Sequence, residues 1–136
     1  MNTMEMKISF NGGKKVYSHY KGFTVETDQP LAEGGDNSAP EPYDLFLASL
    51  GTCAGVYVVY FCEKRNIATD GMDISLEFDK NDRTHLIEEI RMKIKLPKDF
   101  PGKYRNAVVR SAEMCTVKRN LADPPRINVV AEYTEK

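Results

Sequence analysis

The chain has 136 residues, of which 41% are hydrophobic and 29% are charged, a composition typical of a folded protein and not of a disordered one. Nineteen basic residues stand against twenty acidic residues, so the formal net charge is −1. This balance provides no overall positive field for nucleic acid or for an anionic membrane, and we expect neither as a partner. The length predicts a single domain over residues 1–136.

The first residues and the cysteine content indicate the compartment. The segment MNTMEMKISF lacks the basic flank and apolar run of a secretory signal, so we expect a cytoplasmic protein. Three cysteines without a C-x-x-C pair fit neither a disulfide scaffold nor a thiolate zinc site. His19 and His85 have no ligand spacing to the cysteines, and we interpret both as exposed side chains. We therefore predict no metal site.

Alternating apolar and polar residues predict strands at the start of the chain. The alternation runs over residues 4–10, and Asn11-Gly12-Gly13 then supplies a tight turn. Further strands are predicted over residues 16–20 and 23–27, which gives an antiparallel meander. Glycines and prolines from residue 28 to residue 42 predict a loop.

A long apolar helix is predicted from about Pro42 to Arg65. Its stretch from Leu45 to Cys62 carries no charge over eighteen residues, which is the lower limit for crossing a membrane. The stretch also contains two glycines, one serine, one threonine and two tyrosines, and it lies between amphipathic strands. We therefore reject a membrane span and expect a central helix that is buried on most faces.

Two half-exposed strands are predicted after this helix, over residues 72–78 and 86–96, where apolar and polar side chains alternate. Arg91, Lys93 and Lys95 fall on one face of the second strand, which we interpret as a solvated face.

The last third of the chain predicts helices and one more strand. A helix is expected to begin at Pro101, to break near Met114 and to restart over about residues 116–121. A final strand is expected through alternating residues, Ile127, Val129, Ala131 and Tyr133. The order of elements predicts an α+β fold.

Cys53 lies in the middle of the apolar helix, between Gly51 and Gly55. A free cysteine in such a position is most often a small buried hydrophobic residue. The glycines leave room for a ligand or another backbone near its sulfur, although close packing against a neighbouring element explains them equally well. Cys62 lies nine residues further along, half a turn around the helix, and we treat it as a packing residue.

Cys115 follows the predicted break at Met114 and precedes Lys118 and Arg119. A helix start and nearby cations favour the thiolate, which is the reactive form of cysteine. One thiol of low pKa and a second that resolves its sulfenic acid would complete a catalytic cycle. The residues thus indicate thiol redox chemistry by Cys53 and Cys115, and the spacing leaves open which of the two attacks.

Two segments resemble the OsmC/Ohr family of osmotically induced and organic hydroperoxide resistance proteins, closest to its divergent YhfA-like branch. The segments are EGGDNSAPEPYDLFLASLGTCAGVYV and AVVRSAEMCTVKRNLADPPRINV. The resemblance implies antiparallel sheets around a long buried central helix, in an interlocked homodimer. It also implies reduction of small organic hydroperoxides in defence against oxidative stress, with Cys53 as the peroxidatic thiolate and Cys115 as the resolving thiol. No bound cofactor is implied, and an external dithiol would reduce the pair.

The family pattern places a glutamate ten residues before the first cysteine and an arginine in the N-terminal half, which together hold the thiolate and polarise the peroxide. Tyr43 stands at the glutamate position here, with Asp44 beside it. Lys14, Lys15 or an arginine of a partner chain could supply the positive charge.

We take Tyr43, Asp44 and Gly51 as supporting residues of the site. Thr116 stands where a proline usually follows the second cysteine. Because of these departures, the alternative function is a noncatalytic protein that binds a small apolar or electrophilic ligand, or senses oxidation, at a pocket in the dimer interface. A purely structural role ranks third.

Overall fold

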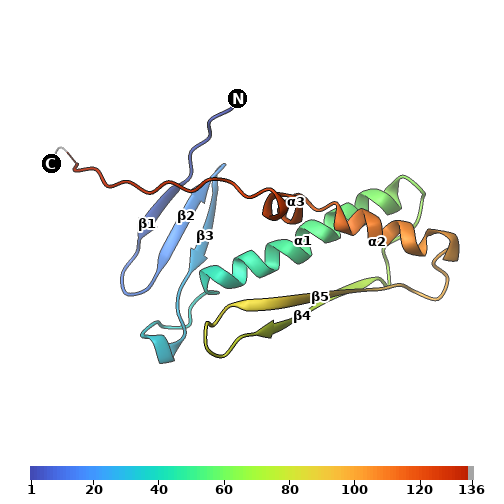
Figure 1. Cartoon of the computed structure of the whole chain (residues 1–136), viewed down its shortest axis with the longest axis horizontal. Helices are drawn as coiled ribbons and strands as arrows, with labels where there is room; N and C mark the ends of the chain where they lie inside the picture. Colours follow the sequence, from blue (N-terminus) through green and yellow to red (C-terminus); the bar gives the residue numbers. More distant parts are fainter. Residues whose placement is uncertain (135–136) are drawn as a thin grey trace. The chain divides into compact units, whose positions relative to one another are not determined.

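The computed structural model describes residues 1–134, and its contacts divide the chain into two compact units, residues 1–49 and the residues from Leu50 onward. The first unit holds a three-stranded sheet, a loop and the start of helix α1, and the second holds the rest of α1, a two-stranded sheet and two further helices (Figure 1). This content of antiparallel strands and helices confirms the predicted α+β class. The prediction of a single domain over residues 1–136 stays a prediction.

The first sheet is an antiparallel meander of β1 (Lys7–Phe10), β2 (Val16–Tyr20) and β3 (Phe23–Thr27). Strands β2 and β3 have the predicted bounds, whereas β1 begins three residues after the predicted start at Met4. The register places Ile8, Ser18 and Val25 in one row across the sheet, so their side chains lie on the same face.

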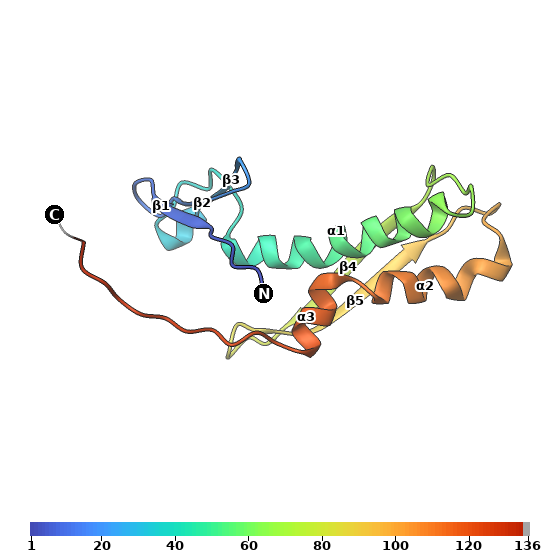
Figure 2. The same ribbon diagram turned by 90° about the horizontal axis from the view of Figure 1, so that it is seen from above.

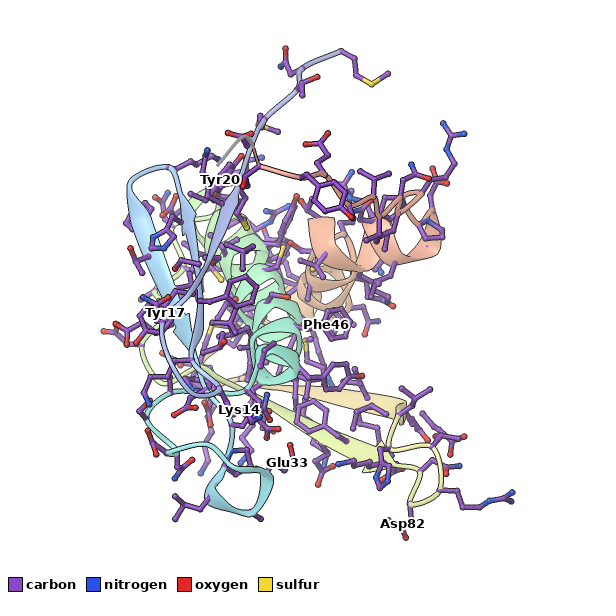
Figure 3. The ribbon with its side chains drawn as sticks, turned by 90° about the vertical axis from the view of Figure 1, so that its left-hand side faces the viewer. Lys14, Tyr17, Tyr20, Glu33, Phe46 and Asp82 are labelled. Carbon is purple, nitrogen blue, oxygen red and sulfur yellow. The ribbon has the colours of Figure 1, made fainter. Side chains whose placement is uncertain are left out.

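The two faces of this sheet differ in chemistry. On one face, the His19 ring lies 2.9 Å from the Ser9 hydroxyl and 3.2 Å from the Thr24 hydroxyl. The other face is apolar and largely uncovered. Its exposed side chains include Ile8 (56%), Phe10 (89%), Phe23 (74%) and Val25 (41%). Tyr17 and Tyr20 belong to β2 (Figure 3).

A buried carboxylate organises the loop between β3 and α1. Asp28 is 0% exposed and accepts four hydrogen bonds. The donors are the backbone N–H groups of Gln29 (2.8 Å), Asp36 (3.2 Å) and Ser38 (3.0 Å), and the Ser38 hydroxyl (2.7 Å). These bonds hold the pKa of Asp28 well below its usual range. The Lys14 side chain also reaches this loop, at Gly34 next to Glu33 (Figure 3).

Helix α1 (Pro42–Glu63) begins at a proline, whose missing N–H would have no helical partner in the first turn. Asp44 accepts a hydrogen bond from the Glu41 N–H at 3.2 Å, which adds a carboxylate at the positive end of the helix. At the other end, the Arg65 guanidinium donates to the Phe61 carbonyl at 3.0 Å and lies 3.7 Å from the centre of the Phe61 ring.

The buried residues of α1 form a stripe and not the nearly complete cover that we expected. They recur at intervals of three or four along the second part of the helix: Leu50, Ala54, Val58, Phe61 and Cys62. Other apolar side chains, such as Tyr60 at 52%, are exposed in the single chain. By length and composition α1 could cross a membrane, but its stripe is part of an apolar core, and we interpret it as a core helix.

The second sheet is the hairpin of β4 (Asp73–Lys80) and β5 (Ile87–Lys95). Its register pairs Ile74 with Ile94 and Leu76 with Met92, so one face is apolar. On the opposite face Arg91 donates to the Asp79 carboxylate at 2.7 and 3.0 Å. The charged run on β5 is therefore a solvated face of paired side chains, as predicted.

Two helices follow: α2 (Arg105–Glu113), which continues the short 3-10 turn Gly102–Tyr104, and α3 (Thr116–Ala122). Helices α1 and α2 run alongside the β4–β5 hairpin (Figures 1 and 2). The core between these elements consists of eight buried side chains: Ala54, Val58, Phe61, Cys62, Phe100, Val108, Ala112 and Cys115. The predicted break near Met114 is confirmed, since Cys115 has an extended backbone between the two helices.

The predicted last strand is wrong for the single chain. Within the described residues, the segment 124–134 carries no regular secondary structure. Its apolar side chains are exposed, with Ile127 at 81%, Val129 at 89% and Tyr133 at 104%. Alternation gives this segment the side-chain pattern of a strand, but a strand also needs the backbone of a neighbouring strand to pair with.

Candidate active site

The fold brings two helices together at the cysteines. Cys53 lies in the middle of α1, and Cys115 occupies the extended residue between α2 and α3. The Ser111 hydroxyl of α2 donates to the Tyr57 carbonyl of α1 at 3.0 Å, which ties the two helices together four residues from each cysteine. The small side chains of Ala54 and Ala112 lie in the same core.

The two thiols lie in the same part of the core. Cys53 and Cys115 are free cysteines, Cys53 packs against the core cluster that contains Cys115, and each thiol shifts the pKa of the other. Cys53 is partly exposed, whereas Cys115 is 2% exposed. The site therefore combines a partly exposed thiol with a buried one.

The surroundings of Cys53 favour its thiolate. Burial by itself raises the pKa of Cys53. Hydrogen bonds from the Val117 N–H, the Cys115 thiol, and the Thr116 N–H and hydroxyl outweigh burial, so the pKa of Cys53 lies below its ordinary value. Cys53 is thus the thiol of the pair that ionises more readily.

Cys115 shows the opposite behaviour. Burial raises the pKa of Cys115, the Lys118 N–H lowers it, and the neighbouring Cys53 raises it further, so the net shift is upward. The sequence suggested that the start of the second helix would favour a Cys115 thiolate. In the structure, the N–H groups of Thr116 and Val117 lower the pKa of Cys53, so Cys53 is the thiol whose pKa falls overall.

A cluster of polar side chains lies next to Cys53. The Tyr57 hydroxyl of α1 is 2.9 Å from the Thr116 hydroxyl of α3. Arg119 Nη2 donates to both oxygens, at 3.3 Å each. The cluster connects a positive charge to Thr116, whose N–H and hydroxyl lower the pKa of Cys53.

An apolar groove of about 440 Å³ lies in the second unit. It is lined by side chains of α1, β5, α2 and α3: Leu50, Ile90, Met92, Ile94, Val109, Ala112, Glu113, Lys118 and Leu121. Leu50 and Ala112 each precede a site cysteine by three residues, which is about one helical turn. Because its lining is mainly apolar, the groove could hold an apolar molecule.

The supporting residues named from the sequence lie in different surroundings. A Cβ atom at Gly51 would come within 3.1 Å of Leu76, so this glycine accommodates the packing of β4 against α1. The Tyr43 ring stacks on Phe46 at 5.5 Å, and Asp44 caps the start of α1. These contacts of Tyr43 and Asp44 are with residues of the first unit.

The lysines named as possible cation donors have partners in the first unit. Lys15 forms an ion pair with Asp36 and lies 4.0 Å from Asp28. The Lys14 side chain reaches Gly34. Arg119, which the sequence placed near Cys115, is the cation that the structure connects to Cys53 through Thr116.

Cys62 behaves as the packing residue that we expected. It is 0% exposed, and its sulfur lies 4.0 Å from the Met72 sulfur. Burial raises the pKa of Cys62, which makes its thiol less reactive. Among residues 1–134, no group of three or more His, Cys, Asp or Glu side chains is placed to hold a metal ion.

Sequence reasoning did not identify Tyr57, and it treated Thr116 only as a departure from a pattern. The helical spacing of both residues could have identified them. Tyr57 follows Cys53 by four residues and so lies on the same face of α1, and Arg119 follows Thr116 by three residues on α3. The sequence did not show that this face of α1 packs against the start of α3.

The fold and the site together define an α+β protein with a pair of free cysteines. One lies in the middle of a core helix, and the other lies between two further helices. The family model described as OsmC-like protein matches residues 35–130, which is more than half of the chain. The chain therefore belongs to the OsmC-like protein family, as the sequence resemblance indicated. A comparison with curated protein sequences gives no match.

Solved structures share the fold at low sequence identity. A Psychrobacter arcticus protein named for an osmotic stress induced and detoxification response has 17% identity and a TM-score of 0.75, over 88% of this chain and 89% of that chain. An OsmC-like protein from Mycoplasma pneumoniae has 11% identity and a TM-score of 0.70, over 90% and 89%. An organic hydroperoxide resistance protein from Legionella pneumophila has 16% identity and a TM-score of 0.56, over 89% and 90%. Membership of this family is consistent with a soluble protein whose α1 is a core helix.

Proposed function

We propose that the protein is a thiol-dependent peroxidase that reduces small organic hydroperoxides and contributes to oxidative stress defence. The observation that carries the proposal is the packing of Cys53 against the core cluster that contains Cys115. This packing combines a thiol whose pKa is lowered with one whose pKa is raised. The names of solved structures with the same fold, among them organic hydroperoxide resistance proteins, support the choice of substrate.

The two thiols divide the reaction between them. The Cys53 thiolate attacks the outer oxygen of the hydroperoxide, the O–O bond breaks, and the alkoxide takes a proton and leaves as the alcohol. Cys53 is now a sulfenic acid. The Cys115 sulfur attacks it, and water leaves as the Cys53–Cys115 disulfide forms. An external dithiol, of lipoyl or thioredoxin type, then reduces the disulfide and is itself oxidised.

The proposal is tested by adding cumene hydroperoxide to the reduced protein at equal concentration and mapping the cysteines by mass spectrometry. We expect a Cys53–Cys115 disulfide in the wild type. In Cys115→Ser we expect a Cys53 sulfenic acid that a dimedone probe traps, and in Cys53→Ser we expect neither product. Cys62→Ser is the matched control, and its products should equal those of the wild type. If the wild type forms neither the disulfide nor the sulfenic acid, the protein is not this enzyme.

The reductant has its own test. Because an intramolecular disulfide is reduced most effectively by a reagent that forms a second ring disulfide, a dithiol should sustain turnover where an equal concentration of monothiol does not. Equal turnover with both reagents would contradict a dithiol partner.

We further propose that the protein works as a homodimer in which a second copy covers the apolar face of the first sheet. That face exposes Phe10, Phe23 and Ile8, and such a surface is costly to leave in water. The segment 127–133 has a strand pattern but no strand partner in the single chain, so it can add to a sheet of a second copy. Sedimentation velocity at micromolar concentration should give the mass of two chains; the mass of one chain would contradict the proposal.

A second candidate function follows from the apolar groove. The protein could bind an apolar or electrophilic ligand there without turnover, since the groove is lined mainly by apolar side chains, among them Leu50 and Ala112. Cumyl alcohol is a suitable unreactive probe. If this function is correct, the alcohol should raise the melting temperature of the wild type and of Cys53→Ser equally, and Met92→Asp in the groove should abolish the effect. Loss of the response in Cys53→Ser would count against it.

A further inference from the structure

Three polar side chains beside Cys53 come from two helices and contact one another. The Tyr57 and Thr116 hydroxyls are 2.9 Å apart, and Arg119 Nη2 lies 3.3 Å from each of them. The Thr116 hydroxyl is also among the groups that lower the pKa of Cys53. The cluster therefore connects a guanidinium to a hydroxyl group that influences the Cys53 thiol.

One arrangement of the hydrogen bonds in the cluster leaves the Thr116 proton free for the Cys53 sulfur. A guanidinium nitrogen such as Arg119 Nη2 carries two N–H groups and accepts no bond, so it can donate to both oxygens. The Thr116 oxygen can accept two bonds and donate one. When it accepts from Arg119 and from Tyr57, both acceptor positions are filled. Its proton is then left for the Cys53 sulfur.

We propose that Arg119 and Tyr57 are positioning residues that hold the Thr116 hydroxyl with its proton directed at the Cys53 sulfur. The inference rests on the proposed function, because a directed donor matters most for a sulfur that reacts as a thiolate. It also assigns a role to the residue that replaces the usual proline after the second cysteine. The donor Thr116 and the cation Arg119 belong to α3, and Tyr57 belongs to α1.

The other groups that lower the pKa of Cys53 are the Val117 N–H, the Cys115 thiol and the Thr116 N–H, and the variants tested below leave them in place. β4 packs against the same part of α1 through uncharged side chains, Leu76 at Gly51 and Ile74 at Gly55. The titratable and charged groups near the thiols are these: Cys115, Tyr57, Arg119 and the ion pair of Lys118 with Glu113 at 3.8 Å. Arg119 is the cation of this set that contacts the Thr116 oxygen.

The test measures the pKa of Cys53 in the full reduced chain. Iodoacetamide alkylation is followed across pH, and mass spectrometry quantifies the peptide that contains Cys53. Thr116→Val should raise the pH midpoint by about half to one unit, which leaves about three- to tenfold less thiolate at neutral pH. Thr116→Ser should restore the wild-type midpoint, because it returns the hydroxyl.

The two positioning residues have matched controls. Tyr57→Phe and Arg119→Gln should shift the midpoint in the same direction by a smaller amount, and the Arg119 effect should shrink at high salt because the side chain is exposed. Tyr60→Phe, one turn further along α1, and Arg110→Gln, on α2, should leave the midpoint unchanged. Circular dichroism and melting temperature establish that each variant is folded; if Thr116→Val does not fold, Tyr57→Phe and Arg119→Gln decide.

An unchanged midpoint in Thr116→Val, or in both positioning variants, overturns the inference. Equal shifts in the control variants also overturn it, since the effect would then be nonspecific. The outcome is separable from that of the proposed function. A wild type that forms the hydroperoxide-induced disulfide while Thr116→Val keeps its midpoint retains the enzyme and loses the positioning role. A wild type that forms no such product while the midpoints shift loses the enzyme and keeps the positioning role.

Discussion

The two units of the chain are stabilised in different ways. In residues 1–49 the buried side chains are polar, Thr27 and Asp28, while aromatic and aliphatic residues of the sheet are exposed. Between residues 50 and 134 the buried side chains are apolar or thiols, and all of them except Leu50 form one cluster. The comparison teaches that the second unit is held by a hydrophobic core, whereas the first has a loop organised by a buried carboxylate and an exposed apolar face on its sheet.

The largest effect should come from the core of the second unit. Phe61→Ala removes a ring that is 7% exposed and packs edge-on against Tyr104 at 5.8 Å. We expect the free energy of unfolding in urea to fall by about 3–5 kcal/mol, because the substitution leaves a cavity in the core. A loss under about 1 kcal/mol would show that this cluster is not a close-packed core.

The same substitution on the open sheet sharpens the contrast. Phe10 is 89% exposed, so Phe10→Ala should change the stability of dilute protein by less than about 0.5 kcal/mol. If a second copy covers this face, the variant should weaken dimerisation by about 1 kcal/mol or more, about fivefold in the dissociation constant measured by sedimentation equilibrium. Unaltered dimerisation would remove Phe10 from the interface.

The polar centre of the first unit should respond to acid. The native pKa of Asp28 lies below its ordinary value of 3.8. Its stabilisation is therefore complete above that ordinary value, and it is lost as the pH falls toward the lower native pKa. The amide NMR signals of Gln29, Asp36 and Ser38 should thus keep their native positions at mildly acidic pH and shift only in stronger acid. A transition centred on the ordinary value would contradict this assignment.

Asp28→Asn tests the same centre at neutral pH. The Oδ2 atom accepts from the Asp36 N–H and from the Ser38 N–H and hydroxyl, and an amide NH₂ group in its place would face these donors. Faster amide hydrogen exchange should appear in the loop, while the core of the second unit exchanges as before. Glu26→Gln, an exposed acid on β3, is the matched control and should change neither.

The smallest effect is expected on the charged face of the β4–β5 hairpin. Arg91 pairs with Asp79, but its side chain is 41% exposed, so solvent screens the pair. Arg91→Gln should cost less than about 1 kcal/mol in urea unfolding, and less still at high salt. A loss as large as that of Phe61→Ala would mean that this pair organises the sheet.

Local patterns in the sequence were sufficient for most elements. β2 and β3 have their predicted bounds, and the restart of the chain as α3 follows from spacing and from the prolines after it. The last strand was predicted, but residues 124–134 form no strand in the structure, because strand formation depends on a pairing neighbour that the pattern does not identify. Asp28 was assigned to a loop without a role, since its four donors come from separate points along that loop.

The sequence named the two cysteines of the candidate site, but it did not predict which of them has the lowered pKa. Cys53 packs against the core cluster that contains Cys115, and the Cys62 sulfur lies 4.0 Å from the Met72 sulfur. The sequence assigned the favourable helix start to Cys115, but the side to which backbone N–H groups point is set by how α3 packs against α1. The same packing brings Tyr57 to Thr116, and no one-dimensional pattern contains that distance.

The position of Cys115 outside both helices has a mechanical consequence for redox cycling. Cys53 belongs to the continuous hydrogen-bonded ladder of α1, while Cys115 has an extended backbone, held through its N–H to Ala112 at 3.3 Å and its carbonyl to Arg119 at 3.0 Å. When the sulfurs join, the adjustment falls on this short connection and the long helix keeps its shape. Oxidation would therefore displace the start of α3 more than it displaces α1.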